Sequence, residues 1–157
     1  MMKAPAKAST NLYVDALVLQ AMRRLSADGN ETALAIADAA LEVNPNSLGA
    51  LTALAGAHVL DDDAVPFREA REQALTLNPA YAQLDIELAE LSVRARRYAL
   101  AVDRAQAAVA LDSMAWEAWG LLGMNQLRVG RIEEGRASLE RAFAGDPYNP
   151  WFKNNLD

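Results

Sequence analysis

The chain has 157 residues, 52% of them hydrophobic and 23% charged, which is the composition of a folded globular domain and excludes a disordered segment. Its formal net charge of −6 argues against nucleic-acid binding, because most proteins of that class have a basic face and a high pI. The chain has no cysteine, which excludes disulfides, thiolate metal sites and a cysteine nucleophile.

The N-terminal residues do not have the pattern of a targeting signal. Met1 to Lys7 include two lysines, but no apolar segment follows them, so we predict no signal peptide and a cytoplasmic location. No stretch of 18 apolar residues is free of charge, and we therefore expect no membrane insertion. Residues 1–13 are expected to form an N-terminal extension.

An internal repeat organises the remainder of the chain. The segment ending in Asn44-Pro45 returns as Asn78-Pro79, and Pro147 follows at twice the same interval. Ser113 occupies the intermediate position. An alanine lies at one fixed offset before each of these four positions: Ala40, Ala74, Ala108 and Ala142. This shared phase is hard to obtain by chance.

The period, about 34 residues, and its landmarks resemble the tetratricopeptide repeat. The resemblance divides the chain into repeats at 14–47, 48–81, 82–115 and 116–149, with 150–157 as the start of a fifth repeat or a short cap. In the last repeat Gln126 replaces the family's tyrosine. Seven other signature positions of the family match there, at Trp119, Leu122, Gly123, Gly130, Leu139, Ala142 and Pro147.

The pattern predicts two helices in each repeat. Gly130 separates the two helices of the last repeat, and the Asn-Pro or Asp-Pro steps end the second helix of a pair. We predict an all-α fold, a right-handed α-solenoid of antiparallel helix pairs with no strands. Small residues recur at one position of the first helix, where they allow the second helix to approach closely: Ala21, Ala55, Ala89 and Gly123.

No motif of catalysis or metal binding is present. The single histidine, His58, is interpreted as a packing or surface residue, because no metal-binding spacing surrounds it. Adjacent acids at Glu133-Glu134 and at 61–63 lie at predicted helix starts, where carboxylates favour the helix dipole. We therefore predict no catalytic residue, no metal and no cofactor, and a chain that is not an enzyme.

The resemblance implies that the first helices of the pairs line a concave groove. We predict that the groove binds an amphipathic helix or an extended peptide, because it is mostly apolar with a few charged positions, which include Glu117. The alternative is that several of these residues only pack between helices. The predicted groove residues are Val18, Met22, Thr52, Gly56, Ile86, Glu90, Val93, Arg94, Met124, Leu127 and Arg128.

The resemblance also allows one mode of binding to be rejected. Some members of the family grip the C-terminal carboxylate of a peptide with lysines and asparagines, but here Val18 and Met22 occupy the first of those places. The turns within the pairs are acidic at 28 and 61–63 and basic at 94–97, 128 and 131. Opposite charge at the two ends would favour weak head-to-tail self-association, and each exposed ion pair is worth only about 0–1 kcal/mol.

The leading functional hypothesis is a protein–protein interaction scaffold, either free-standing or a segment of a larger multidomain bacterial protein. One alternative is a small acidic secretion chaperone built from such repeats. Another is the repeat region of an enzyme whose catalytic domain lies outside this chain, since Gly145 to Trp151 resembles repeat ends joined to metallopeptidase-like domains. An open reading frame that continues past Asp157 would favour the scaffold or the enzyme.

Overall fold

The computed structural model describes residues 7–156, and over this range it contains helices and no strand. The chain divides into two compact units, one ending at Asn78 and the other beginning at Pro79. The first unit holds α1 (Lys7–Arg24), α2 (Glu31–Val43), α3 (Leu48–Leu60) and α4 (Ala64–Leu77). The second holds α5 (Ala82–Arg94), α6 (Tyr98–Leu111), α7 (Trp116–Arg128), α8 (Ile132–Gly145) and α9 (Pro150–Leu156). The all-α prediction is confirmed.

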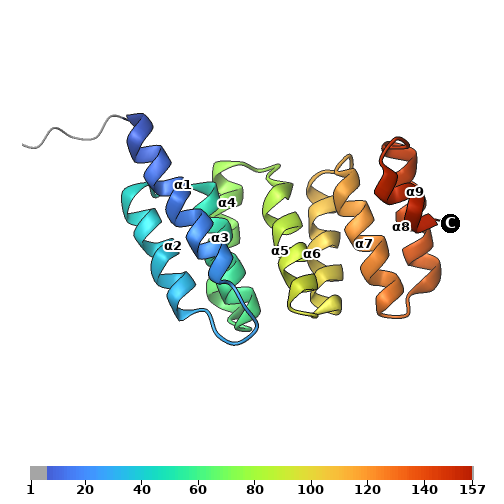
Figure 1. Ribbon diagram of the computed structural model, residues 1–157, viewed down its shortest axis with the longest axis horizontal. Helices are drawn as coiled ribbons and strands as arrows, with labels where there is room; N and C mark the ends of the chain where they lie inside the picture. Colours follow the sequence, from blue (N-terminus) through green and yellow to red (C-terminus); the bar gives the residue numbers. More distant parts are fainter. Residues whose placement is uncertain (1–6, 157) are drawn as a thin grey trace, which may run out of the picture. The chain divides into compact units, whose positions relative to one another are not determined.

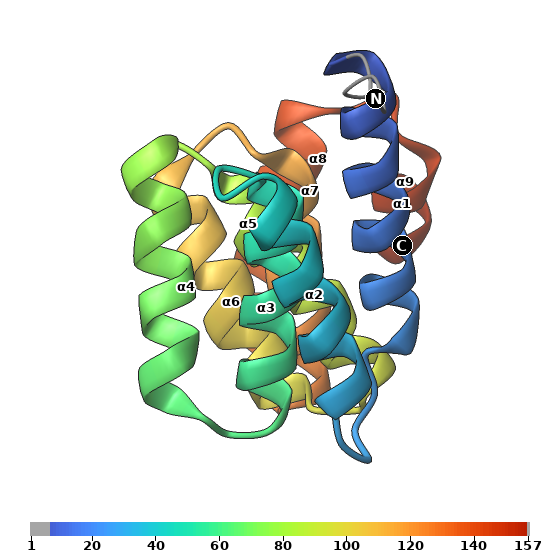
Figure 2. The same ribbon diagram turned by 90° about the vertical axis from the view of Figure 1, so that its left-hand side faces the viewer.

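In the first unit successive helices run antiparallel, and α3 packs against α1, α2 and α4 (Figures 1 and 2). One cluster of its core joins Ala21, Ala37 and Ala53, with Met22 and Leu54 packed around them. Alanine contributes little buried area per residue, so this core depends on close contact between backbones.

A buried asparagine joins the two turns of the first unit. Asn30 is 2% exposed, and its amide nitrogen donates to the carbonyl oxygen of Ser26 at 3.0 Å and to Asp61 Oδ1 at 2.7 Å. Its amide oxygen accepts from the Ser26 backbone N–H at 2.9 Å. Because its donor and acceptor both have partners, this polar side chain is buried without the cost of unmade hydrogen bonds.

The second unit repeats the pairing, with α7 packed against α5, α6 and α8 (Figure 1). Its core includes Ile86, Ala105 and Leu122. Beside that core an ion pair joins α5 to α6, with Arg104 Nη1 at 3.1 Å from Asp85 Oδ1. The Asp85 side chain is fully buried, so loss of its cationic partner would leave a buried charge uncompensated.

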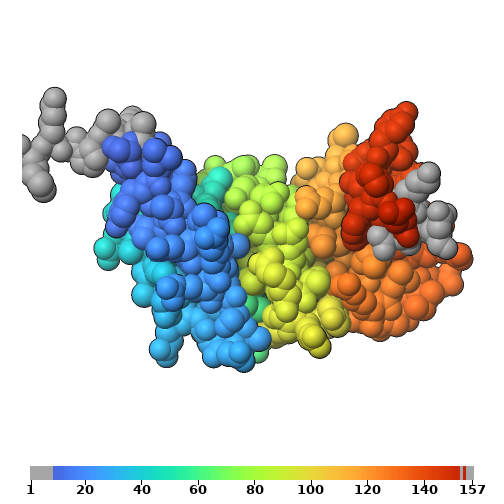
Figure 3. Space-filling model, in the orientation of Figure 1, coloured from blue at the N-terminus to red at the C-terminus, as the bar shows by residue number. Residues whose placement is uncertain are grey.

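The seven-residue helix α9 covers the end of the second unit (Figure 3). Its Phe152 is 3% exposed and lies against Gly120 of α7, together with Trp151. The α9 segment had been predicted as the start of a fifth repeat or a short cap, and its helical conformation fits both descriptions. Asp157 lies outside the described residues.

The first helix differs from its predicted extent. Part of the predicted N-terminal extension, residues 7–13, belongs to α1, because no proline or glycine interrupts the chain between Lys7 and Gly29. Residues 1–6 lie outside the described residues. The α1 helix also ends at Arg24, so the turn of the first repeat is longer than the other three.

The recurring small residues lie where the helices approach most closely. Ala21, Ala55 and Ala89 are fully buried, and Gly123 is buried at the equivalent position of α7. A Cβ atom on Gly123 would lie 2.8 Å from the carbonyl oxygen of Gly135 on α8. The two backbones of this pair are therefore closer than any residue larger than glycine permits at this point.

Each turn within a helix pair contains a residue with positive φ. Gly29 and Gly130 have φ of 117° and 85°, while Asp62 and Arg96 adopt 60° and 58°. Arg96 and Gly130 are one repeat apart and hold the same place in their turns. An L-residue in this left-handed region is strained by the contact of its Cβ with the backbone, so Arg96 stores strain that glycine avoids.

We expect Gly123→Ala to lower the free energy of unfolding by about 2 kcal/mol, because its methyl group would overlap the α8 backbone. Alanine is otherwise the better helix former by about 1 kcal/mol, so a net loss reports the contact. The matched control is Gly49→Ala, where the nearest atom is a Val18 methyl at 3.0 Å and the change should stay within about 0.5 kcal/mol. Urea unfolding followed by circular dichroism gives both values, and equal effects would contradict the close approach.

Arg96→Gly should raise the free energy of unfolding by about 1 kcal/mol, because glycine removes the strain of the left-handed conformation. Gly130→Ala, at the same place one repeat later, should lower it by about 1 kcal/mol. No atom lies within 4 Å of the Cβ position at Gly130, so this loss would come from the backbone alone. Thermal unfolding measures both, and a less stable Arg96→Gly protein would argue against strain at this turn.

Candidate functional site

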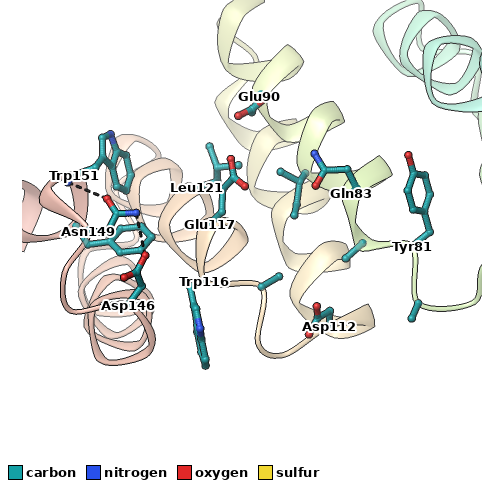
Figure 4. A pocket seen from close by; sticks show the side chains of 15 residues that line it. Tyr81, Gln83, Glu90, Asp112, Trp116, Glu117, Leu121, Asp146, Asn149 and Trp151 are labelled. Carbon is teal, nitrogen blue, oxygen red and sulfur yellow. Dashed lines mark hydrogen bonds between the residues drawn. The ribbon is translucent and has the colours of Figure 1, made fainter. Parts of the chain in front are cut away.

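The second unit has an open cavity of about 790 Å³ beside α5, α7 and α9 (Figure 4). The three helices are the first helices of successive repeats, and the loops that precede them also line the cavity. One position is shared by all three helices: Gln83, Glu117 and Trp151 follow one another at the interval of the repeat. The same position of three successive repeats therefore contributes a different side chain to the wall of the cavity.

Aromatic and aliphatic side chains form much of the wall. Trp116 lies at the start of α7 with its ring against the backbone of Gly145, where only a residue without a Cβ leaves it room. Trp151 is 44% exposed and meets Phe152 edge to face, with ring centroids 5.3 Å apart and planes at 77°. Such rings offer apolar contact area to a bound segment with little loss of conformational entropy.

Four carboxylic acids line the cavity, and two of them are engaged by their own loops. Asp112 Oδ1 accepts from the backbone N–H of Met114 at 2.9 Å. Asp146 Oδ2 accepts from the side-chain amide of Asn149 at 3.3 Å (Figure 4). These two acids stabilise the turns that enter α7 and α9, and they add negative charge at the edge of the cavity.

The other two acids, Glu90 on α5 and Glu117 on α7, interact with each other. Burial raises the pKa of Glu90, and the negative charge of Glu117 is the next cause, with a hydrogen bond between the two carboxyl groups and the charge of Glu87 adding to it. The Arg94 guanidinium acts in the opposite direction. Partial burial and the neighbouring Glu117 thus both disfavour the charged form of Glu90.

Comparison with known proteins gives matches of structure only. No family model and no curated protein matches the chain. Many solved structures share its arrangement of helices, YrrB, PilF and the first TPR of RPAP3 among them. YrrB, a TPR protein with an unusual peptide-binding site, is 23% identical, with a TM-score of 0.56 over 94% of this chain and 70% of that chain. PilF of Pseudomonas aeruginosa is 20% identical, with a TM-score of 0.60 over 94% and 68%.

The third structure is the first TPR of Spaghetti (RPAP3) bound to the HSP90 peptide SRMEEVD. It is 19% identical, with a TM-score of 0.53 over 69% of this chain and 86% of that chain. The chain has the tetratricopeptide-repeat fold. At these identities the likeness establishes only the fold of this chain, and its ligand has to be argued from its own residues.

The structure brings only part of the predicted groove into the cavity. Ile86 and Glu90 line it. Gln83 and Glu117, which share one position of the repeat with each other, line it as well. Val93, Arg94 and Met124 lie further along α5 and α7 and are not among the lining residues.

Two other predicted residues make contacts within the second unit that are unconnected with the cavity. Leu127 packs against Gly135 of α8. Arg128 stacks over the Tyr98 ring, 5.0 Å from its centroid, and donates to Asn125 Oδ1 at 3.1 Å. Both side chains therefore join neighbouring helices, which is the packing alternative that the sequence left open.

The predicted groove residues of the first unit are mainly engaged in helix packing. Val18 belongs to a hydrophobic cluster around Val14 and Ala50, and Met22 to the alanine cluster of the core. Thr52 is fully buried, with its hydroxyl donating to the carbonyl oxygen of Leu48 at 2.8 Å. Gly56 is buried in α3. Their binding role stays a prediction.

The sequence argument missed the loop and aromatic residues of the cavity. Trp116 and Trp151 stand at the first and second positions of their helices, and Asp112 and Asp146 stand before them at equivalent places in successive repeats. The phase of the repeat was sufficient to align Asp112 with Asp146, whereas the two tryptophans stand one position apart in that phase. What it did not reveal is that the cavity opens beside the starts of the helices and extends into the preceding loops.

The histidine and some of the acidic residues considered in the sequence analysis contact neighbouring side chains. His58 Nδ1 lies 3.6 Å from Asp63 Oδ2, and Glu134 forms an ion pair with Arg131 at the start of α8. Within residues 7–156 no group of three or more histidine, aspartate or glutamate side chains is arranged to hold a metal ion. No helix among those residues is long and apolar enough to cross a membrane.

We expect Glu90→Gln to stabilise the protein at pH 7 by less than about 1 kcal/mol, because solvent screens part of the repulsion that it removes. The raised pKa means that folded Glu90 keeps its proton to a higher pH than unfolded Glu90 does. Stability of the wild type should therefore fall as the pH rises through that interval, and the advantage of Glu90→Gln should vanish in acid.

Urea unfolding between pH 4 and pH 8 tests this expectation. Glu140→Gln, an exposed acid on α8 that is not among the cavity residues, is the matched control and should show no such pH-dependent gain. A Glu90→Gln protein that is less stable than the wild type at pH 7 would contradict the repulsion.

Proposed function

We propose that this tetratricopeptide-repeat protein is a non-catalytic interaction scaffold that binds a peptide segment of a partner protein in the cavity of its second unit. The observation that carries the proposal is the cavity itself, which is open, about 790 Å³ in volume and walled by aromatic and aliphatic side chains with a few polar groups. Ligand-binding sites have this size and composition, and aromatic rings gathered in one cavity favour a binding surface more than a single exposed ring does.

The structural neighbours support the same class of function. YrrB is a TPR protein with a peptide-binding site, and the first TPR of RPAP3 holds the HSP90 peptide. Both share the fold and not the residues of this chain, so they support a peptide as the ligand and say nothing of its sequence. Binding a short segment also fits the register of the wall, in which the first helices of three successive repeats each present one side chain.

A binding role accounts for the carboxyl pair better than a catalytic role does. Glu117 is exposed, and the pair faces an open cavity, whereas acid–base catalysis usually takes place where water is excluded.

Weak head-to-tail association remains part of the proposal, since Asp28, Asp62, Arg94, Arg96 and Arg131 are all exposed. Asp61 is less available for such association, because its carboxylate accepts a hydrogen bond from the Asn30 side chain.

A pair of aromatic variants tests the cavity as the binding site. Peptides selected on the wild-type protein from a random display library should lose at least about tenfold in affinity for Trp151→Ala, because the ring forms part of the wall. Tyr148→Ala is the matched control: it removes a neighbouring aromatic side chain that is 94% exposed and lines no part of the cavity. Fluorescence anisotropy with labelled peptides gives the affinities.

The result also separates the cavity from the longer groove predicted from the sequence. If Trp151→Ala binds the selected peptides as tightly as Tyr148→Ala does, the cavity is not the site. Met124→Glu and Met22→Glu then test the groove beyond the cavity, one in each unit, with helical circular dichroism confirming that each variant is folded. Binding that survives all of these substitutions would refute a concave site.

A further inference from the structure

We propose that the segment bound in this cavity carries a lysine or arginine whose cationic group lies between Glu90 and Glu117, with apolar side chains of the same segment against Trp116 and Trp151. This inference rests on the proposed function and names the chemistry of the partner. The cavity selects the segment by charge as well as by shape.

The charge of the lining residues is the first argument. The cavity has four carboxylic acids and no lysine or arginine among its lining residues, and they come from α5, α7 and the two loops before α7 and α9. Acidic residues that are distant in sequence thus come together in one cavity. A concave wall with a low-dielectric surface focuses such a field and raises the local concentration of cations.

The second argument is that the acids differ in what they already hold. Asp112 and Asp146 are engaged by their own turns, as described above. No salt bridge joins Glu90 or Glu117 to a basic side chain of the part of the chain that the structure describes. Arg94, one turn further along α5, influences Glu90 electrostatically without forming a salt bridge to it. The carboxyl pair therefore keeps its capacity to accept hydrogen bonds from a ligand.

Helix stability alone accounts for one member of the pair only. Glu117 lies in the first turn of α7, where a carboxylate interacts favourably with the helix dipole. Glu90 lies in the third turn of α5, away from both helix ends, where its proximity to Glu117 raises the energy of the charged state. A cation between the two would convert this repulsion into two favourable contacts.

The aromatic walls favour the same kind of side chain. Lysine and arginine have apolar stems that pack on hydrophobic surface while their charged groups reach a polar partner. Figure 4 shows Glu90 and Glu117 on neighbouring helices, with Trp151 beyond Leu121 and Trp116 below it. A segment that places a basic residue at the pair can therefore lay neighbouring apolar residues on the rings, where cation–π contact adds to the attraction.

The proposed chemistry distinguishes this cavity from the RPAP3 site. The peptide SRMEEVD, which that protein binds, contains three acidic residues and one basic residue. Four carboxylates in the wall would repel it. This peptide is consequently a suitable negative probe, because it is a known ligand of the same fold with the wrong charge for this wall.

The test begins with random heptapeptides selected on the full chain. Selected sequences should be enriched in lysine or arginine beside aromatic or aliphatic residues. For one such peptide, replacing its basic residue by glutamine should weaken binding to the wild type about tenfold. The same replacement should have almost no effect on the double variant Glu90→Gln/Glu117→Gln, since the interaction is then already lost. SRMEEVD should not bind measurably.

The controls keep misfolding from imitating the result. Glu140→Gln removes an acid of the second unit that is not among the cavity residues, and it should bind the peptide as the wild type does. The double variant should be at least as stable as the wild type, because it removes repulsion, and circular dichroism checks this. Raising the salt concentration should weaken binding of the lysine peptide more than binding of its glutamine version.

The outcomes for the two proposals are separable. If the selected peptides depend on Trp151 but show no excess of basic residues, or if the double variant binds the basic peptide as tightly as the wild type, the charge inference is refuted and the peptide-binding function stands. If no peptide binds, or if binding ignores Trp151, the proposed function is refuted and this inference with it.

Discussion

The structure depends on how closely the two helices of each pair can approach. One buried position of the first helix recurs as alanine three times and as glycine once, and at Gly123 the facing backbone leaves no room for a methyl group. Close packing of this kind gives many short contacts from small side chains, and it allows a chain with only 6% aromatic residues to fill the core of each unit. The larger aromatic side chains are then not required to fill the core and can lie at the surface.

That freedom is visible in the second unit. Two of the three tryptophans of the chain line the cavity, while core positions there are occupied by alanine, valine, isoleucine and leucine. The position of Trp116 depends on Gly145, and that of the α9 aromatics on Gly120. Small residues therefore determine both the spacing of the helices and the places in which rings can stand beside the cavity.

The sequence was sufficient to predict the fold, because the same structural signals recur in each repeat. The constant period, the alanines in phase and the prolines at the junctions all constrain the backbone, and Gly130 lies between α7 and α8, as expected for the last repeat. Helix α1 was less well predicted, because no proline or glycine lies between Lys7 and Gly29 to mark the boundary expected at residue 14.

The site was predicted only in part, for a physical reason. Periodicity shows which side of a helix faces inward, and two of the residues that it indicated, Ile86 and Glu90, line the candidate cavity. It does not show how far along the helix the surface stays open. Leu127 and Arg128 have the same inward phase, but Leu127 fills the space beside Gly135 and Arg128 is drawn onto Tyr98. Such contacts depend on the partner helix and not on the phase.

The arrangement of the tryptophans has a spectroscopic consequence. Trp116 and Trp151 line the cavity, whereas Trp119 is occupied elsewhere, with its indole N–H donating to the Ser113 carbonyl oxygen at 3.0 Å and the Arg141 guanidinium 4.5 Å from its ring centroid. Indole emission depends on the polarity around the ring, so filling the cavity would alter two of the three emitters and leave the third as an internal reference. The protein thus contains its own label for ligand occupancy.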